Sequence, residues 1–399
     1  MKTFKKVFIG LGLCLLVYLS FSVGNATGKR TAIANENGIP LAKINKIENL
    51  IDQYYLFDID KNKQQEGAVE GYVKALGDPY SEFLTKEEMD SLNQQTEGEY
   101  AGVGIVVTPS ETGAITVVSA IKGSPAFEKG IKKDDIILKI NGKDYNASQM
   151  NDAVKVMKGK PNTDVKLTIA RMENKTSKIF DVNITRRMIS LTTVNSKKIG
   201  DIGYINITQF DRKTDKEFIE QYENLKKQNV KSIVLDLRNN PGGLLDSTVK
   251  IADYLLPQGV IVKTVDKNKK EDVQKSDSSE QNLPMVVLVN GSSASASEIL
   301  TGALKDYKKA TIVGEKTFGK GIVQTIIPMD KGEGLKLTIS EYFSPNGNKI
   351  HKQGVKPDVE IKLDEKAKGI GVEFMKEDNQ LQKTLEILNK KALEILNKK

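Results

Sequence analysis

Two short, mostly apolar runs, each followed by a turn of small residues and then by a helical pattern, constrain the fold most strongly. The first run covers residues 232–237 and leads into a turn at 239–243, and the second covers 285–289 and leads into a turn at 291–295. Beyond each turn, apolar residues recur at spacings of three and four, which indicates a helix. Repeated strand–turn–helix units predict an α/β sheet within residues 189–363.

The segment 97–188 has a different periodicity and is predicted to form a compact module of its own. Its strand-like runs lie at residues 104–108, 114–118, 136–140 and 165–171. Between them, Ser124-Pro125 opens a short helical stretch that closes at Gly130, the expected order of an N-cap, a first-turn proline and a C-terminal glycine. A second helical stretch is predicted at 149–157.

Helical patterns flank these two regions. In residues 27–96 the apolar spacing predicts one helix from about residue 41 and a second near 68–76, which stops at Gly77-Asp78-Pro79. The polar, low-complexity stretch 267–282 is expected to be a loop.

The C-terminal segment 364–399 contains a repeat, because residues 385–391 and 393–399 have the same sequence. A period of eight is close to two helical turns, so the apolar residues of the repeat share one face. That face would pack on the protein body or contact a second subunit, and we favour packing.

Residues 1–26 are typical of a targeting segment, either a signal peptide or a membrane anchor. Lys2, Lys5 and Lys6 precede a mostly apolar run, and Gly24-Asn25-Ala26 supplies the small residues that a signal peptidase recognises. The run approaches the roughly 17-residue minimum for crossing a bilayer, so an uncleaved anchor is one alternative and a buried helix is another. We expect export across the cytoplasmic membrane of a bacterial cell, leaving the body extracytoplasmic, either secreted or tethered to the membrane.

Composition excludes several kinds of chemistry. The only cysteine, Cys14, lies in the N-terminal apolar run, so the rest of the chain can form neither a disulfide nor a thiolate nucleophile. With one histidine, His351, the chain also lacks the ligands of a typical zinc site, and we expect no metal and no other cofactor. The net charge of +8 comes from scattered lysines without a basic stripe, which argues against nucleic acid as a partner.

Ser295 stands where a nucleophile would be useful. It follows an apolar run and opens a helix, whose free N–H groups and positive dipole end can stabilise an oxyanion. Its small neighbours Ala294 and Ala296 leave room for a substrate carbonyl. The alternative is that the serines of this turn are only cap and turn residues.

A serine hydroxyl needs a base, and with His351 in a loop-like stretch that base is expected to be a lysine or a carboxylate. Lys320 enters an apolar strand, where desolvation can lower its pKa from the usual value of about 10.4. Lys316 is the competitor, but it neighbours Glu315 and would be solvated. Gln324 is four residues beyond Lys320, so in a strand the two side chains would share a face and the amide could orient the amine.

Two motifs together resemble the carboxyl-terminal processing proteases, also called tail-specific proteases, which are serine peptidases of family S41. The resemblance rests on Ser293-Ala294-Ser295-Ala296-Ser297-Glu298-Ile299 and on Gly314-Glu315-Lys316-Thr317-Phe318-Gly319-Lys320-Gly321. It extends from Leu76-Gly77-Asp78-Pro79-Tyr80 to Gly354-Val355-Lys356-Pro357-Asp358-Val359, most of the mature chain.

The resemblance implies a role for each matching residue. Ser295 and Lys320 have the spacing of the family's Ser–Lys dyad, and Gln324 stands where the family has its lysine-orienting residue. Asn240-Pro241-Gly242-Gly243 resembles the oxyanion loop, so an N–H of Gly242 or of Gly243 would join that of Ala296.

The module at 97–188 resembles a PDZ domain. Its carboxylate-binding loop would be formed by Ala101, Gly102, Val103, Gly104 and Ile105. Consecutive backbone N–H groups in such a turn can hold a terminal carboxylate, while the following strand edge pairs with the peptide by β-addition.

The fold implied by the resemblance is a crotonase-like (ClpP/crotonase type) α/β protease core at 189–363 with an inserted PDZ domain and helical N- and C-terminal segments. The implied activity is that of a serine endopeptidase that recognises the free C-terminus of a protein substrate and cleaves through an acyl-enzyme. Family members often dimerise, so a homodimer is an expected partner state. The alternatives are a non-catalytic PDZ scaffold on a degenerate hydrolase fold and a peptidoglycan hydrolase, which would lack its usual histidine- and cysteine-based sites.

Overall fold

A computed structural model describes residues 41–397 except for 111, 174–175 and 278–279. The chain divides into two compact units, Met1–Ala68 and Val69–Lys399, so the predicted helical region 27–96 spans both of them. The targeting segment predicted at 1–26 lies outside the described residues. Within the described part, no helix is both long and apolar enough to cross a membrane.

The first unit contains α2 (Leu41–Tyr54) and the beginning of α3 (Lys61–Lys74). The predicted first helix is therefore confirmed, whereas α3 starts earlier than the predicted 68–76 because a polar first turn hides its beginning. α2 has no buried residue, and its apolar residues Ile44, Ile47 and Leu50 remain exposed.

The second unit is built around a six-stranded sheet with the order β10-β11-β12-β15-β16-β19. Only β10 is antiparallel to its neighbour, so the predicted α/β sheet is confirmed. The strands are β10 (Val194–Ile199), β11 (Ile202–Ile207), β12 (Ser232–Asp236), β15 (Met285–Val289), β16 (Ala310–Gly314) and β19 (Val359–Glu360).

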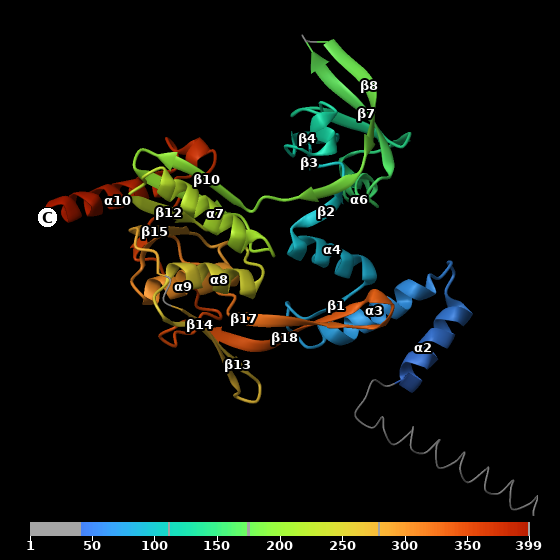
Figure 1. The fold of residues 1–399 in the computed structure, drawn as a ribbon. Coiled ribbons are helices and arrows are strands. Elements are labelled where there is room, and N and C mark those ends of the chain that lie inside the picture. Colours follow the sequence, from blue (N-terminus) through green and yellow to red (C-terminus); the bar gives the residue numbers. More distant parts are fainter. Residues whose placement is uncertain (1–40, 111, 174–175, 278–279, 398–399) are drawn as a thin grey trace, which may run out of the picture. The chain divides into compact units, whose positions relative to one another are not determined.

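Helices cover both faces of this sheet, which explains why its central strands are almost continuously apolar (Figure 1). On β12, Ile233 and Leu235 point into the core beneath α7–α9, whereas Val234 belongs to the cluster beneath α10. The helices are α7 (Thr214–Lys227), α8 (Leu245–Leu255), α9 (Ala296–Asp306) and α10 (Asn379–Asn397).

The first copy of the C-terminal repeat lies in α10. Leu388 of the first repeat is buried against the sheet, and Leu385 and Ile387 pack against the same cluster, so the first repeat packs on the protein body. The side chains of the second repeat lie outside the described part.

A second sheet of antiparallel strands corrects one prediction. The stretch 267–282 is not simply a loop, because residues 271–276 form β14, which pairs with β13. Its polar sequence concealed an edge strand whose order comes from this pairing. The strands are β1 (Glu82–Leu84), β13 (Gly259–Asp266), β14 (Glu271–Ser276), β17 (Ile322–Pro328) and β18 (Gly334–Phe343).

The module at 97–188 forms a third sheet with the order β3-β4-β5-β7-β8, and β6 pairs with β5. The four predicted strands and both predicted helical stretches are present. The strands are β3 (Ile105–Pro109), β4 (Ile115–Ala120), β5 (Ile136–Ile140), β6 (Lys143–Asp144), β7 (Asp164–Glu173) and β8 (Thr176–Thr185), and the helices are α5 (Pro125–Glu128) and α6 (Met150–Met157).

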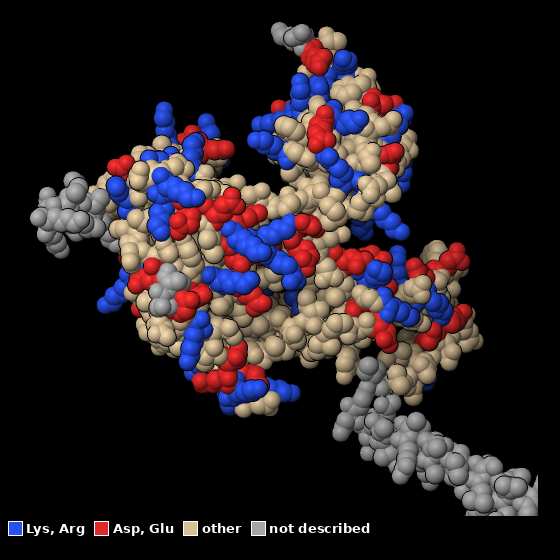
Figure 2. Space-filling view, viewed as in Figure 1, with Lys and Arg blue, Asp and Glu red and all other residues tan. Residues whose placement is uncertain are grey.

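Two strands link this module to the rest of the second unit. β2 (Glu99–Gly102) pairs with β9 (Arg187–Ser190), and α4 (Lys86–Glu97) precedes β2. Figure 2 shows that lysine and arginine side chains are interspersed with carboxylates over the face in view, so neither sign of charge forms a continuous area there.

Candidate active site

Ser295 occupies a strained turn between β15 and α9. Its φ is 55° and its ψ is −115°, a combination that costs free energy in a residue with a side chain. Two hydrogen bonds from the preceding residues fix this turn. The Ser293 hydroxyl donates to the Leu237 carbonyl (2.8 Å), and the Ala294 amide donates to the Asn240 carbonyl (3.1 Å). Ser295 itself is only half-buried, so a strained but accessible hydroxyl stands at the start of a buried helix.

The Asn240-Pro241-Gly242-Gly243 turn lies directly against Ser295. A Cβ atom on Gly242 would lie 2.9 Å from Ser295 Cβ and 3.0 Å from the Ala296 nitrogen, and the φ of Gly242 is 104°. Glycine is therefore required at this position both by space and by backbone conformation.

The amides around this turn are not equally available. The Gly242 amide donates to Asn240 Oδ1 (2.9 Å), whereas the amides of Gly243 and Ala296 have no acceptor in the described part of the chain. The sequence leaves open which of the two glycines would donate to an oxyanion, and Gly243 is the one whose N–H group is free in the described part of the chain.

Glu298, a fully buried carboxylate, joins the Ser295 turn to the Lys320 loop. Its Oε2 atom accepts hydrogen bonds from the amides of Ser295 (2.9 Å) and Lys320 (2.8 Å). Its Oε1 atom accepts from the Gly319 amide (2.7 Å) and from the Thr317 hydroxyl (2.6 Å). Burial raises the pKa of Glu298, and these hydrogen bonds oppose that rise.

Tyr342 provides a second connection between the same two segments. Its buried hydroxyl lies 3.0 Å from the Ser295 carbonyl oxygen and is also within hydrogen-bonding distance of the Lys320 carbonyl oxygen. The Ser295 turn and the Lys320 loop are thus fixed to each other through one carboxylate and one phenol.

Lys320 is half-buried and lies over the ring of Tyr80, with its Nζ atom 4.8 Å from the ring centroid. Burial lowers the pKa of Lys320, and the positive charge of Lys336 lowers it further, while Asp78, Glu82 and Glu298 act in the opposite direction. A lowered pKa makes the neutral amine more available as a base.

The local structure around Lys320 differs from the prediction. β17 begins at Ile322, so Lys320 precedes the strand instead of entering it. The flanking glycines explain this, because Gly319 has a φ of 93° and a Cβ on Gly321 would lie 2.2 Å from the His351 nitrogen. The chain passes close to another backbone segment at this point before it joins the sheet.

Gln324 lies in β17, but its amide has other partners. Its Nε2 atom is 3.3 Å from Thr338 Oγ1 and 3.4 Å from the Ile322 carbonyl oxygen. The register of β17 on β18 shifts between Val323 and Gln324, so the simple alternation that would align Gln324 with Lys320 does not apply. In the described residues, no hydrogen bond joins the Lys320 amine to Gln324 or to Ser295 Oγ.

The competing candidates are placed differently. Lys316 is exposed to solvent, in line with the solvation expected for it. His351 lies in a turn beside Gly321, and its buried Nδ1 atom has no hydrogen-bond partner. Its proximity to the Lys320 loop could not be anticipated from a lone histidine in a loop-like stretch.

The predicted carboxylate-binding loop connects β2 to β3. Gly104 has a φ of 81°, and a Cβ there would lie 2.2 Å from Ser124 Cβ. The Gly104 carbonyl accepts hydrogen bonds from the Ile121 amide (2.9 Å) and the Ser124 hydroxyl (3.1 Å), so this carbonyl is engaged within the domain. β3 lies at one edge of its sheet, as strand addition by a peptide would require.

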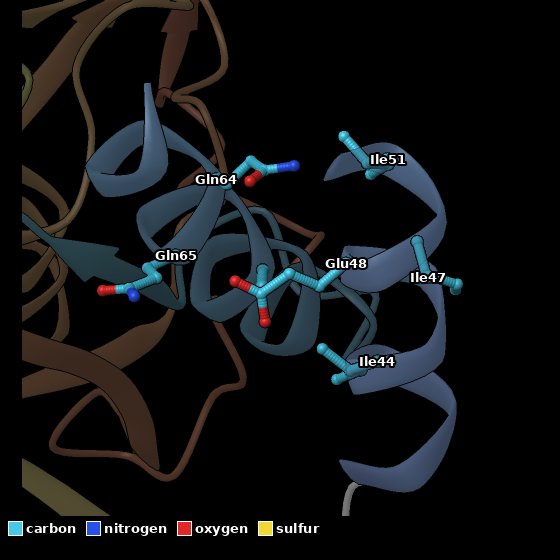
Figure 3. A pocket seen from close by; sticks show the side chains of 7 residues that line it. Ile44, Ile47, Glu48, Ile51, Gln64 and Gln65 are labelled. Carbon is cyan, nitrogen blue, oxygen red and sulfur yellow. The ribbon is translucent and has the colours of Figure 1, made fainter. Parts of the chain in front are cut away.

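The first unit contains an apolar groove between α2 and α3 with a volume of about 360 Å³ (Figure 3). Its walls are formed by Ile44, Ile47, Glu48, Ile51, Gln64, Gln65 and Ala68. Glu48 is the only ionisable side chain among them, so the groove offers no nucleophile–base pair.

Sequence reasoning assigned no role to three residues of the candidate site. Glu298 was visible as the residue three positions after Ser295, but a glutamate there is equally typical of a helix first turn. Tyr80 belongs to a conspicuous turn motif, and its contact with Lys320 crosses 240 positions of sequence. Tyr342 has no local signal at all.

Family comparisons support this arrangement of modules. The peptidase family S41 profile matches residues 201–361, a PDZ domain profile matches 116–171, and the N-terminal domain of the activating protease CtpB matches 21–88.

Relatives from two staphylococcal species extend the same similarity over most of the chain. A "Probable CtpA-like serine protease" of Staphylococcus aureus strain N315 is 42% identical over 336 residues, which cover 82% of this chain and 67% of the relative. Its counterpart in Staphylococcus epidermidis strain RP62A is 36% identical and covers 89% of this chain and 72% of the relative. A solved structure of a candidate S41 protease from Bacteroides fragilis NCTC 9343 covers 84% of this chain and 92% of that one, with a TM-score of 0.53 and 17% identity, which supports the fold.

Proposed function

This chain belongs to the S41 family of CtpA-like carboxyl-terminal processing proteases, which are serine proteases with a PDZ domain, and we propose that it cleaves protein substrates with Ser295 as nucleophile and Lys320 as base. The observation that carries the proposal is that one oxygen of Glu298 accepts hydrogen bonds from the backbone amides of both Ser295 (2.9 Å) and Lys320 (2.8 Å). Together with the strained φ of Ser295, it supports a preorganised pair rather than two unrelated residues.

The reaction would begin with proton transfer from Ser295 Oγ to the neutral Lys320 amine as Oγ bonds to the substrate carbonyl carbon. The resulting oxyanion would accept hydrogen bonds from the amides of Ala296 and Gly243. Collapse of this intermediate breaks the C–N bond, and the Lys320 ammonium protonates the leaving amine. Water then hydrolyses the acyl-enzyme, with Lys320 again accepting the proton.

Gln324 would act by orienting the Lys320 amine. For this, the Gln324 side-chain amide would have to exchange its present contact with Thr338 for a hydrogen bond to the Lys320 amine once substrate is bound. Catalytic hydrogen bonds are often long before the substrate complex forms, so the present partners of Gln324 are compatible with this role.

The direct test of the proposed function uses a fluorogenic peptide with an apolar, free C-terminus and its amidated twin. The protease should cleave the free-acid peptide in preference to the amide, and a fluorophosphonate probe should label Ser295 in mass spectrometry. Absence of both cleavage and labelling in the folded protein would favour a non-catalytic PDZ scaffold.

We extend the proposal to the PDZ domain, where the amides of residues 101–105 would receive the substrate carboxylate. Gly104→Val is expected to weaken cleavage of long, tail-bearing substrates by roughly tenfold or more, because the new side chain meets Ser124 at a positive φ. The measurement is kcat/KM on a long substrate and on a short peptide.

Gly113→Val is the matched control for this prediction. Gly113 lies in the same domain at a φ of 79°, but nothing lies within 4 Å of an added Cβ. Equal losses in the two variants, or unchanged cleavage of the long substrate by Gly104→Val, would contradict tail capture by this loop.

The remaining parts of the proposal concern architecture and location. Residues 189–363 would form a crotonase-like core, residues 97–188 the inserted PDZ domain, and residues 364–399 the C-terminal helical segment. The predicted targeting segment supports an extracytoplasmic enzyme that is secreted or tethered to the membrane, and recovery of the protein only from cytosol on cell fractionation would exclude this.

A homodimer is proposed on the basis of the exposed apolar face of α2, where Ile44, Ile47 and Leu50 are each more than one third exposed. Contiguous exposed apolar surface of this kind is typical of an interaction site. Light scattering should give twice the chain mass, and Ile47→Glu should convert the dimer to a monomer. A monomer in the unmodified protein would contradict this proposal.

A further inference from the structure

The guanidinium of Arg238 is completely buried between two carboxylates that are far apart in the sequence. Asp236 Oδ2 lies 2.6 Å from Nη2, and Asp378 approaches with both oxygens, at 2.7 Å from Nη2 and 2.9 Å from Nη1. Gln380 Oε1 accepts a further bond from Nη1 (3.0 Å). Both carboxylates are almost completely excluded from solvent, so this is an interior network and not a surface ion pair.

Arg238 stands between the end of β12 and the proposed oxyanion loop. Two residues later, the Asn240 carbonyl accepts hydrogen bonds from the Ala294 amide (3.1 Å) and the Ser297 hydroxyl (3.0 Å). The backbone that carries the guanidinium therefore continues directly into the segment that touches the Ser295 turn.

Asp378 belongs to the C-terminal segment and also caps α10. Its Oδ1 atom accepts the Leu381 amide (2.9 Å), and its Oδ2 atom accepts the Gly371 amide (2.7 Å). Burial alone would raise the pKa of Asp378, but the Arg238 guanidinium and these amides hold it below the usual range, so the carboxylate stays charged. A buried ion network of this kind favours one arrangement of its segments over others.

We propose that Asp378 is a positioning residue for catalysis. Through its ion pair with Arg238, it determines where the chain leaves β12 and thereby aligns the proposed oxyanion loop with Ser295. The inference rests on the proposed function of that loop. It gives the C-terminal segment a part in the chemistry, although none of its described residues is among the proposed catalytic groups.

Asp378→Asn separates this role from helix capping, because asparagine is as good an N-cap as aspartate but cannot pair with Arg238 as a carboxylate does. We expect kcat to fall by about 10- to 100-fold with KM changed less than about threefold, since a small displacement of the loop affects mainly the transition state. The affinity of a peptide aldehyde, whose adduct with Ser295 places an oxygen in the oxyanion site, should fall in parallel.

The control is Glu373→Gln, which removes an exposed carboxylate from the same segment and should leave kcat, KM and aldehyde affinity unchanged. Circular dichroism and thermal melting establish that each variant is folded at the assay temperature. If Asp378→Asn does not fold, Gln380→Met decides the matter, since it removes one acceptor of Arg238 and should lower kcat by about 3- to 10-fold.

Unchanged kcat in folded Asp378→Asn would overturn this inference but not the proposed function. Where Gln380→Met is used in its place, unchanged kcat in that variant has the same consequence. A lower kcat with unchanged aldehyde affinity would overturn it as well, because Asp378 would then not act through the oxyanion loop. Peptide cleavage by Ser295→Ala would instead contradict the proposed function and this inference with it.

Discussion

Ser295→Ala and Lys320→Ala are each expected to lower kcat by roughly 10⁴-fold or more, and the double variant should be no worse than either single one. In the proposed dyad the nucleophile and its base act as one unit, so removal of either would eliminate the same step. Kinetics on the free-acid peptide provide the measurement, and circular dichroism verifies the fold.

Two other variants test whether Lys320 is the base. Lys316→Ala should retain activity because its side chain is exposed, and His351→Ala should retain substantial activity because a lysine-based site needs no imidazole. Loss of turnover in a folded His351→Ala, or full activity in Lys320→Ala, would show that the base has been misassigned.

The pH dependence of kcat/KM provides an independent test of the base. Only the neutral lysine can accept the serine proton, so kcat/KM should rise with pH through a pKa below that of free lysine, in the direction set by burial and Lys336. Lys336→Gln removes a positive neighbour and should move the rise to higher pH, whereas Lys316→Gln should not move it. An unchanged profile in Lys336→Gln would contradict the assignment of this rise to Lys320.

Gly242→Val is expected to lower kcat by about 10²- to 10³-fold, a loss similar to that caused by removing an oxyanion-hole donor. The first carbon of the new side chain would lie 2.8 Å from the Ala294 carbonyl oxygen and 2.9 Å from Ser295 Cβ, so the turn or Ser295 must move. Steady-state kinetics and the rate of fluorophosphonate labelling should fall together.

Gly347→Val is the control for this variant. Gly347 also has a positive φ, 79°, but no atom lies within 4 Å of an added Cβ, so it reports backbone strain without a clash. A loss of the same size in Gly347→Val would mean that Gly242 matters for stability and not for the geometry at Ser295.

Local features of the sequence were sufficient for much of the fold. The apolar runs that became β12 and β15, and the helices that follow them, could be recognised because burial on both faces of a parallel sheet leaves a continuous apolar pattern. Ser295 and Lys320 could be named because their motifs and spacing resemble a known family. The polar strand β14 escaped recognition, since its order depends on pairing with β13.

The relation between the candidate residues was decided only by the tertiary structure. Glu298 and Tyr342 connect the Ser295 turn to the Lys320 loop, Tyr80 meets the amine, and Asp378 reaches Arg238 across 140 positions. Such contacts follow from how the sheets and helices pack, and neither periodicity nor composition records which distant side chains packing brings together. The sequence alone determined the kinds of residue available for the chemistry and the local elements that carry them, whereas packing determined which amide stays free, which carboxylate holds the two segments and where the lysine amine lies.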